Sequence, residues 1–420
     1  MQVTTSYRPQ LSEIKAAQER LKGVITHTPL MKNLTYSEKY GADVFFKRED
    51  LQVVRSYKIR GAHNKITSLK QQQAIKGVVC ASAGNHAQGV AYSCRILGVK
   101  ATIFMPAPTP NQKVEQVKFF GKEWVDVILI GDTFDDAYHL AKEYCTKAQS
   151  VFIHPFDNEL VIEGQGTVGL EVLEDTNSNI DFLFMPIGGG GLASGVSSVF
   201  KQISPQTKLI GVEPQGAPAM QNSIALKENT TLSEIDKFVD GAAVKRVGEK
   251  TFEICKHQLD SVVTVPEGLV CSTMLDLYNK DAIVVEPAGA LSIAALEQLK
   301  NEIQGANIVC VVSGSNNDIS RTPEIKERSL IYEGLKHYFI INFPQRVGAL
   351  REFLVEVLGP SDDIVLFEYM KKTAKERGPA LIGIELKVKS DFEPLMKRIS
   401  LKNIQAEYLN QKPEILQYYI

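Results

Sequence analysis

Four short segments combine residue types that could bind and activate a small phosphorylated molecule. The first, Ser56 to Ala62, reads SYKIRGA and opens an expected helix. A lysine is badly placed at a helix N-terminus, where the dipole favours anions, unless its amine is bound as an imine. The helix end and nearby Arg60 would also lower the pKa of Lys58, which favours a nucleophile and base. Taken alone, however, a single lysine is most often an ordinary surface residue.

The second segment, Ser82 to His86, reads SAGNH and lies between an expected strand and an expected helix. Backbone N–H groups at a helix N-terminus suit a carboxylate, and the neutral amide of Asn85 could contact a phenolic oxygen of a ring. An ordinary turn with Asn85 as helix cap explains the same residues equally well. His86 fits a loop or capping residue better than a catalyst.

The third segment is a run of four glycines, Gly188 to Gly191, directly after an expected strand. Without Cβ atoms, successive amides can wrap a phosphate at the N-terminus of the next helix. The spacing lacks the GxGxxG pattern with a later acidic residue, and it lacks the GK[ST] of a P-loop. We therefore predict phosphate binding without a dinucleotide site.

The fourth segment, Ser313 to Asn316, ends another expected strand. Ser313 could hydrogen-bond a heterocyclic nitrogen, although a turn serine is the simpler explanation for this residue alone. The four segments share one expected location in the fold. All are expected at or near the carboxyl ends of parallel strands, where open α/β sheets bind ligands.

The elements that must position these segments alternate between short apolar runs and amphipathic stretches. Continuous β-branched runs are typical of strands buried on both faces, and their alternation with helices predicts right-handed βαβ units and parallel sheets. We predict a two-lobed α/β catalytic domain at residues 1–325, with a small lobe at about 56–154 inserted in the large lobe. Strands are predicted at 44–48, 77–82, 101–105, 125–130, 182–187, 209–212, 262–265 and 308–312.

The pattern changes after Arg321. Residues 326–336 are predicted as a connector within a charged stretch. Residues 337–411 follow the order β-α-β-β-α-β, which is typical of a ferredoxin-like α+β domain. Its elements are predicted at 337–343, 348–358, 363–370, 380–388, 392–399 and 404–409, with a polar turn at 371–379.

Composition excludes several classes of function. The chain has 420 residues, which argues for more than one domain; 47 Lys and Arg stand against 49 Asp and Glu. This balance gives no basic patch for binding nucleic acid or an anionic membrane.

No apolar run reaches membrane-spanning length, and residues 1–21 lack the apolar core of a signal peptide, so we expect a cytoplasmic protein. The six cysteines form no CxxC pair, and we expect free, buried thiols.

Together the four segments resemble, in type, order and spacing, the fold-type II pyridoxal 5′-phosphate (PLP) enzymes of the tryptophan synthase beta-like family, and within them threonine dehydratase. This resemblance runs over about residues 7–321, and Glu286 to Ala290 adds to it. The tail resembles the single ACT-like regulatory domain of short biosynthetic threonine dehydratases, on its pattern and on the FPQRVGAL of residues 343–350.

The resemblance implies a role for each site residue. Lys58 forms the imine with PLP and serves as the catalytic base, Asn85 contacts the 3-oxygen, and Ser313 faces the pyridine nitrogen. Glu286 lies near the cofactor. The implied phosphate site is Gly188, Gly189, Gly190, Gly191 and Leu192, and the implied site for the substrate carboxylate is Ser82, Ala83, Gly84, Asn85 and His86.

The implied activity is dehydration and deamination of L-threonine to 2-oxobutanoate and ammonia, the first step of isoleucine biosynthesis. A hydroxyl at Ser313 cannot stabilise a pyridinium as an aspartate would, so the ring is a weaker electron sink, suited to elimination over transamination. The tail implies allosteric inhibition by isoleucine, with valine opposing it, and a homo-oligomer, tetramer or dimer, with paired tails. The implied effector site is Arg346, Val347, Gly348, Ala349 and Leu350.

Three alternatives stay open. The same scaffold supports serine dehydration, serine racemisation, or β-replacement as in cysteine synthase. A non-catalytic amino-acid sensor would use the tail without needing Lys58, and a nucleotide-binding oxidoreductase would need the missing fingerprint. Related enzymes can hold a divalent cation near the position of Glu213, but Ala217 and Ala219 stand where acidic ligands would be sought, so we expect no metal. A potassium ion held mainly by backbone carbonyls stays an open alternative.

Overall fold

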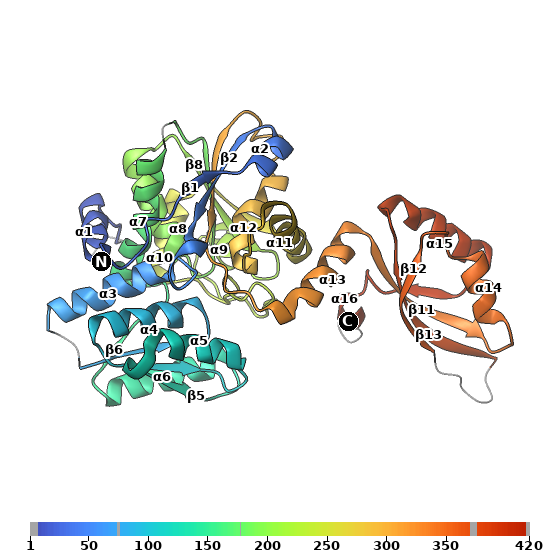
Figure 1. Ribbon diagram of the computed structural model, residues 1–420, viewed down its shortest axis with the longest axis horizontal. Coiled ribbons are helices and arrows are strands. Elements are labelled where there is room, and N and C mark those ends of the chain that lie inside the picture. Colours follow the sequence, from blue (N-terminus) through green and yellow to red (C-terminus); the bar gives the residue numbers. More distant parts are fainter. Residues whose placement is uncertain (1–6, 74–75, 177, 370–375, 417–420) are drawn as a thin grey trace. The chain divides into compact units, whose positions relative to one another are not determined.

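The computed structural model describes residues 7–73, 76–176, 178–369 and 376–416. Two compact units divide the chain at Asp318, with unit 1 covering 1–318 and unit 2 covering 319–420 (Figure 1). The predicted boundaries at 325 and 336 stay predictions.

Unit 1 contains a six-stranded sheet in the order β1-β2-β10-β7-β8-β9. The pairs among β2, β10, β7, β8 and β9 are parallel, as predicted, and the short edge strand β1 pairs antiparallel with β2. The strands are β1 (Leu30–Lys32), β2 (Asp43–Arg48), β7 (Phe182–Pro186), β8 (Lys208–Pro214), β9 (Ser261–Val265) and β10 (Asn307–Val312). β7 is buried along its whole length, which explains its continuous apolar sequence.

Helices cover this sheet in Figure 1, and α7 and α8 also pack against one another. The helices of this part are α1 (Leu11–Leu21), α2 (Leu34–Tyr40), α7 (Glu159–Asp175), α8 (Gly191–Ile203), α9 (Ala219–Leu226), α10 (Glu249–Gln258), α11 (Glu267–Asp281) and α12 (Pro287–Ala294).

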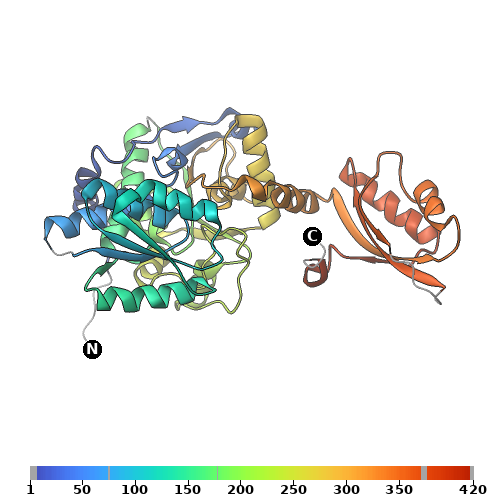
Figure 2. The same ribbon diagram turned by 60° about the horizontal axis from the view of Figure 1, so that its bottom comes forward.

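A second, fully parallel sheet in unit 1 has the order β5-β4-β3-β6. Figure 2 brings this sheet and its helices forward. Its strands are β3 (Val78–Ala81), β4 (Ala101–Met105), β5 (Val125–Leu129) and β6 (Val151–Phe152), and its helices are α3 (Lys58–Gln71), α4 (Asn85–Leu97), α5 (Asn111–Gly121) and α6 (Phe134–Lys147). β3 is buried at all four residues, and Gly98, with φ 64°, ends α4 in the left-handed region. The two α/β lobes are confirmed; β1 and β6 were not predicted, because each is too short to show periodicity.

Unit 2 contains a four-stranded antiparallel sheet in the order β12-β13-β11-β14. Its strands are β11 (Lys336–Pro344), β12 (Asp363–Tyr369), β13 (Arg377–Glu385) and β14 (Ala406–Tyr408), and its helices are α13 (Thr322–Glu333), α14 (Ala349–Glu356), α15 (Phe392–Leu401) and α16 (Pro413–Leu416). The predicted β-α-β-β-α-β order is confirmed, and this strand order is that of the ferredoxin-like unit.

Two details of unit 2 differ from the prediction. The charged stretch expected as a connector contains α13, which has a proline in its first turn and ends at Gly334 with φ 70°. The expected turn at 371–379 overlaps β13, where Arg377 to Pro379 pair with β11. Tertiary pairing overrides the turn propensity of Gly378 and Pro379. Residues 371–375 of that turn, with Met370, lie outside the described residues.

All six cysteines are described and buried, and none of them forms a disulfide, as expected. Among the described residues, no helix is long and apolar enough to cross a membrane.

Candidate active site

The predicted segments meet because strand ends of both sheets in unit 1 supply them. Ser82 to His86 follow β3, Gly188 to Gly191 follow β7, and Ser313 follows β10. A bridge between Ser56 and Gly314 joins the start of α3 to the last of these loops. The Tyr57 backbone N–H also donates to the Ser313 carbonyl at 3.2 Å.

Lys58 is the first residue of α3 and is partly buried. Its Nζ donates to the backbone carbonyl of Pro155 at 3.1 Å, just beyond the end of β6. Burial lowers the pKa of Lys58 to about 8, and the carboxylate of Glu286 opposes that shift. The amine is therefore held in place and loses its proton far more readily than a surface lysine.

Arg60 does not have the effect on Lys58 that the sequence predicted. Its fully buried guanidinium forms ion pairs at 2.7 Å with both Glu49 and Glu171. Because two carboxylates neutralise it, Arg60 offers little net positive charge to its neighbours. The lowered pKa of Lys58 comes from burial instead.

The glycine run forms a tight loop at the N-terminus of α8, with Gly190 at φ 91°. A Cβ on Gly189 would lie 2.2 Å from the ring of Phe156, and one on Gly190 would lie 2.8 Å from Thr251. Thr251 Oγ1 donates to the Gly189 carbonyl at 2.6 Å, which fixes the loop. Side chains are thus excluded and backbone amides line a helix N-terminus, an arrangement that fits a phosphate. Leu192 packs its side chain into the core, so only its amide could contribute.

Asn85 starts α4, and its side-chain amide is held on both sides. Asn85 Nδ2 donates to Glu286 Oε1 at 2.6 Å. Asn85 Oδ1 accepts from Asn316 Nδ2, also at 2.6 Å. Burial raises the pKa of Glu286 to about 7, and Asp240 adds to the rise. Asn316 belongs to a motif that the sequence singled out, but no role was predicted for it.

The remaining predicted binding residues have main-chain partners. Ser82 Oγ accepts from the Gly84 backbone N–H at 3.3 Å. His86 is buried, its Nε2 lies 2.9 Å from the Ile153 carbonyl, and burial lowers its pKa to about 3, so the ring is neutral. Ser313 Oγ donates to the Ala288 carbonyl at 3.3 Å. Their contacts with substrate and cofactor stay predictions.

Sequence reasoning missed the residues that close the site from neighbouring segments. Pro155 and Phe156 follow β6, yet they contact Lys58 and the glycine loop. Ala242 approaches Gly188, where a Cβ would lie 3.0 Å from its Cα. None of them carries a chemical signal in the sequence, because they contribute a carbonyl or simple bulk.

Glu213 uses its carboxylate within the fold. Its oxygens accept the backbone N–H groups of Met220 and Gln221 at 2.7 and 2.9 Å, and burial raises its pKa to about 8. Ala217 and Ala219 are buried beside it. Over the described part of the chain, no three His, Cys, Asp or Glu side chains cluster closely enough to hold a metal ion.

The predicted effector segment lies in unit 2 at the start of α14. Arg346 forms a two-bond ion pair with Glu352 at 2.8 and 2.5 Å. Val347 is 99% exposed, and Gly348 has φ 84° before the helix begins at Ala349. Whether an amino acid binds here stays a prediction.

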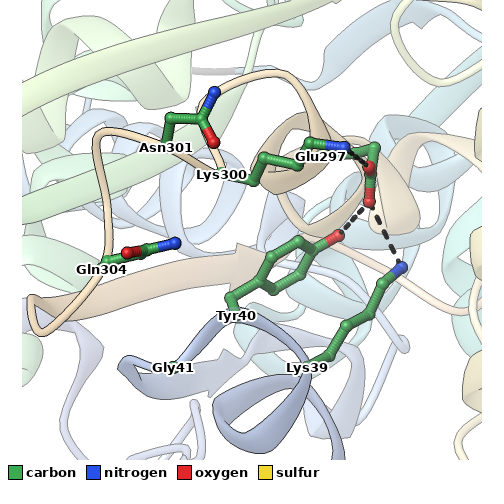
Figure 3. Close-up of a pocket in the computed structure, with 7 residues that line it drawn as sticks. All are labelled: Lys39, Tyr40, Gly41, Glu297, Lys300, Asn301 and Gln304. Carbon is green, nitrogen blue, oxygen red and sulfur yellow. Dashed lines mark hydrogen bonds and ion pairs between the residues drawn. The ribbon is translucent and has the colours of Figure 1, made fainter.

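A surface pocket of about 540 Å³ lies elsewhere in unit 1, lined by Lys39, Tyr40, Gly41, Glu297, Lys300, Asn301 and Gln304 (Figure 3). Glu297 at its centre accepts from Tyr40 and Lys300 and pairs with Lys39. The lining includes none of the predicted site residues, and the active site at Lys58 stays a prediction.

Comparison with known proteins shows the family of this chain. A family model described as pyridoxal-phosphate dependent enzyme matches residues 21–314. A second, described as the C-terminal regulatory domain of threonine dehydratase, matches residues 327–420. The biosynthetic L-threonine dehydratase IlvA of Halalkalibacterium halodurans is 58% identical over 411 residues, covering 98% of this chain and 99% of the relative. This chain belongs to the biosynthetic threonine dehydratase family of pyridoxal-phosphate dependent enzymes.

Solved structures agree with the fold of this threonine dehydratase family member. The processed form of threonine deaminase isoform 2 from Solanum lycopersicum is 38% identical, covers 77% of this chain and 95% of its own, and has a TM-score of 0.72. Maize serine racemase is 32% identical, covers 78% and 99%, and has a TM-score of 0.71. The fold is therefore shared by enzymes named for different substrates.

Proposed function

We propose that this chain converts L-threonine to 2-oxobutanoate and ammonia in a PLP-dependent reaction, as the first step of isoleucine biosynthesis. The observation that carries the proposal is the partly buried amine of Lys58, held on the Pro155 carbonyl with a pKa lowered to about 8, near a glycine loop that excludes side chains. The match of both family models along one chain supports it.

The residues present fit the cofactor. Lys58 offers an amine for its aldehyde, and the amides of Gly188 to Leu192 offer a phosphate site at the N-terminus of α8. We assign the 3-oxygen to Asn85 and the pyridine nitrogen to Ser313. When bound, PLP supplies an electron sink for the charge that develops at the substrate Cα.

Lys58 acts as the base in this proposal. Its amine takes the Cα proton of threonine, and the Pro155 carbonyl keeps the amine oriented. Backbone amides at the start of α4, from Ser82 to His86, orient the substrate carboxylate. The neutral ring of His86 stays on the Ile153 carbonyl and takes no proton.

Replacement of Lys58 tests this assignment. Lys58→Ala should abolish threonine turnover and the visible absorbance of the bound cofactor, because it removes the amine that the proposal assigns to the cofactor aldehyde. Lys65, on the same helix and with a pKa also lowered by burial, gives the matched control. Lys65→Ala should retain both signals. Normal turnover by the Lys58 variant would contradict the proposal.

The main alternative is serine chemistry on the same scaffold, because maize serine racemase shares the fold. Purified enzyme should form 2-oxobutanoate from threonine faster than pyruvate from serine or D-serine from L-serine. A reversed order would favour the alternative.

The tail supports a regulatory proposal. We infer that isoleucine inhibits and valine opposes it, through residues 346–350 of unit 2, in a dimer or tetramer with paired tails. The exposed Val347 and the helix start at Ala349 provide an apolar contact and backbone amides for an amino acid. The cytoplasmic location stays a prediction.

A further inference from the structure

Three side chains from distant parts of unit 1 form one hydrogen-bonded chain at the active site. Asn316 lies beyond β10, Asn85 starts α4, and Glu286 precedes α12. Asn316 Nδ2 donates to Asn85 Oδ1 at 2.6 Å, and Asn85 Nδ2 donates to Glu286 Oε1 at 2.6 Å. Both hydrogen bonds therefore run in one direction, from Asn316 through Asn85 to Glu286.

A backbone carbonyl fixes the direction of these two hydrogen bonds. Asn316 Nδ2 also donates to the carbonyl of Val54 at 2.9 Å. A backbone carbonyl can only accept, so the amide of Asn316 cannot turn over without placing two oxygens against each other. Asn316 must then present N–H to Asn85, and Asn85 must receive it with Oδ1.

Glu286 is the last acceptor in this series of hydrogen bonds. Its carboxyl lies against Gly314, where a Cβ would come within 2.5 Å of Oε1, and its backbone N–H donates to the Gly314 carbonyl at 3.2 Å. A Cβ at 314 would push this carboxyl out of its present place, and the backbone hydrogen bond ties Glu286 to the loop after β10, which also carries Asn316. Glu286 accepts one of the two hydrogens on Asn85 Nδ2, and the second is available to a ligand.

We propose that Asn316 is a positioning residue that fixes the side-chain amide of Asn85 with its N–H groups toward Glu286 and the cofactor. In the reverse orientation, Asn85 would set its oxygen against the 3-oxygen of PLP and against the Glu286 carboxylate in its ionised form. Two acceptors would then meet, and the contact assigned to Asn85 would turn from attractive to repulsive. This inference rests on the proposed function.

A double-mutant cycle on the cofactor-loaded chain tests the inference. Asn316→Ala should weaken PLP affinity about tenfold, the effect of one lost hydrogen bond of ordinary strength, and should shift the visible absorbance, which reports the environment of the 3-oxygen. In an Asn85→Ala background, the same substitution should change neither signal, because the residue it positions is already gone. Asn316→Asp should be worse than Asn316→Ala, since a carboxylate faces the Asn85 oxygen and the Val54 carbonyl.

Asn317 provides a matched control in the same turn. Its buried Oδ1 has no hydrogen-bond partner among the described residues, so Asn317→Ala should leave affinity and spectrum unchanged. Thermal unfolding of each variant separates a folding defect from a positioning defect. Wild-type affinity and spectrum in Asn316→Ala, or a full additional loss in the Asn85→Ala background, would overturn the inference. A wild-type chain with no visible absorbance would instead refute the proposed function itself.

Discussion

At the scale of single residues, burial decides the chemistry of Lys58. Its ammonium loses water contacts inside the site, and this lowers its pKa to about 8 against 10.5 for an ordinary lysine. The Glu286 carboxylate favours the charged form and limits the shift. The two groups therefore tune one another.

This balance predicts a pH dependence. Only the neutral amine attacks an aldehyde, so the rate at which the cofactor-free chain captures PLP should rise with pH through about 8 and level off above it. Stopped-flow absorbance would follow it. Because the Glu286 carboxylate raises the pKa of Lys58, Glu286→Gln should move the midpoint to lower pH. A midpoint near 10.5 would contradict the buried amine.

At the scale of secondary-structure elements, a buried ion cluster ties the start of α3 to its neighbours. Arg60 of α3 pairs with Glu49, just after β2, and with Glu171 of α7. Lys47 of β2 also pairs with Glu171, at 2.8 Å. All four side chains are almost fully buried, so each charge depends on its partner.

Removing one partner should therefore be costly. Arg60→Met should lower the free energy of unfolding by about 3–5 kcal/mol, because it leaves the buried Glu49 carboxylate without its cation and Glu171 with Lys47 alone. Urea unfolding measures the change. The exposed pair Lys118–Glu115 on α5 is the control, and Lys118→Met should cost less than about 1 kcal/mol. Equal effects of the two substitutions would show that the buried cluster contributes nothing special.

At the scale of the whole molecule, the catalytic and regulatory functions fall in separate units. The proposed active site lies within residues 1–318, and the proposed effector segment lies within 319–420. In unit 2, Tyr338 OH donates to Glu327 of α13 at 2.5 Å. Helix α13 thus belongs with the tail, and the natural truncation point lies before it.

A truncation at Asp318 tests this separation. The chain of residues 1–318 should form 2-oxobutanoate from threonine and should lose its response to isoleucine and valine. Steady-state assays with and without each effector would measure both. Circular dichroism of the truncated chain would check that it is folded. Retained inhibition in this chain would place the effector site in unit 1 and refute the proposal for residues 346–350.

The sequence by itself determined the longer strands and the type of site, but not β1, β6 or α13. Buried parallel strands carry continuous apolar runs, and the glycine run shows directly where side chains must be absent. These are local patterns, so 101–105 was predicted with the bounds of β4, and the order of the tail was confirmed. Gly378 and Pro379 mark the limit, because pairing with β11 overrode their preference for a turn.

Only the tertiary structure decided how the site residues act on one another. The sequence predicted that Arg60 lowers the pKa of Lys58. In the folded chain, however, the Arg60 guanidinium forms ion pairs with Glu49 and Glu171. Asn316 and Asn85 lie 231 positions apart, and no periodicity relates them. A hydrogen bond or ion pair depends on which atoms the packed fold brings within about 3 Å. The residue types therefore limit which interactions are possible, and the fold determines which pairs of residues form them.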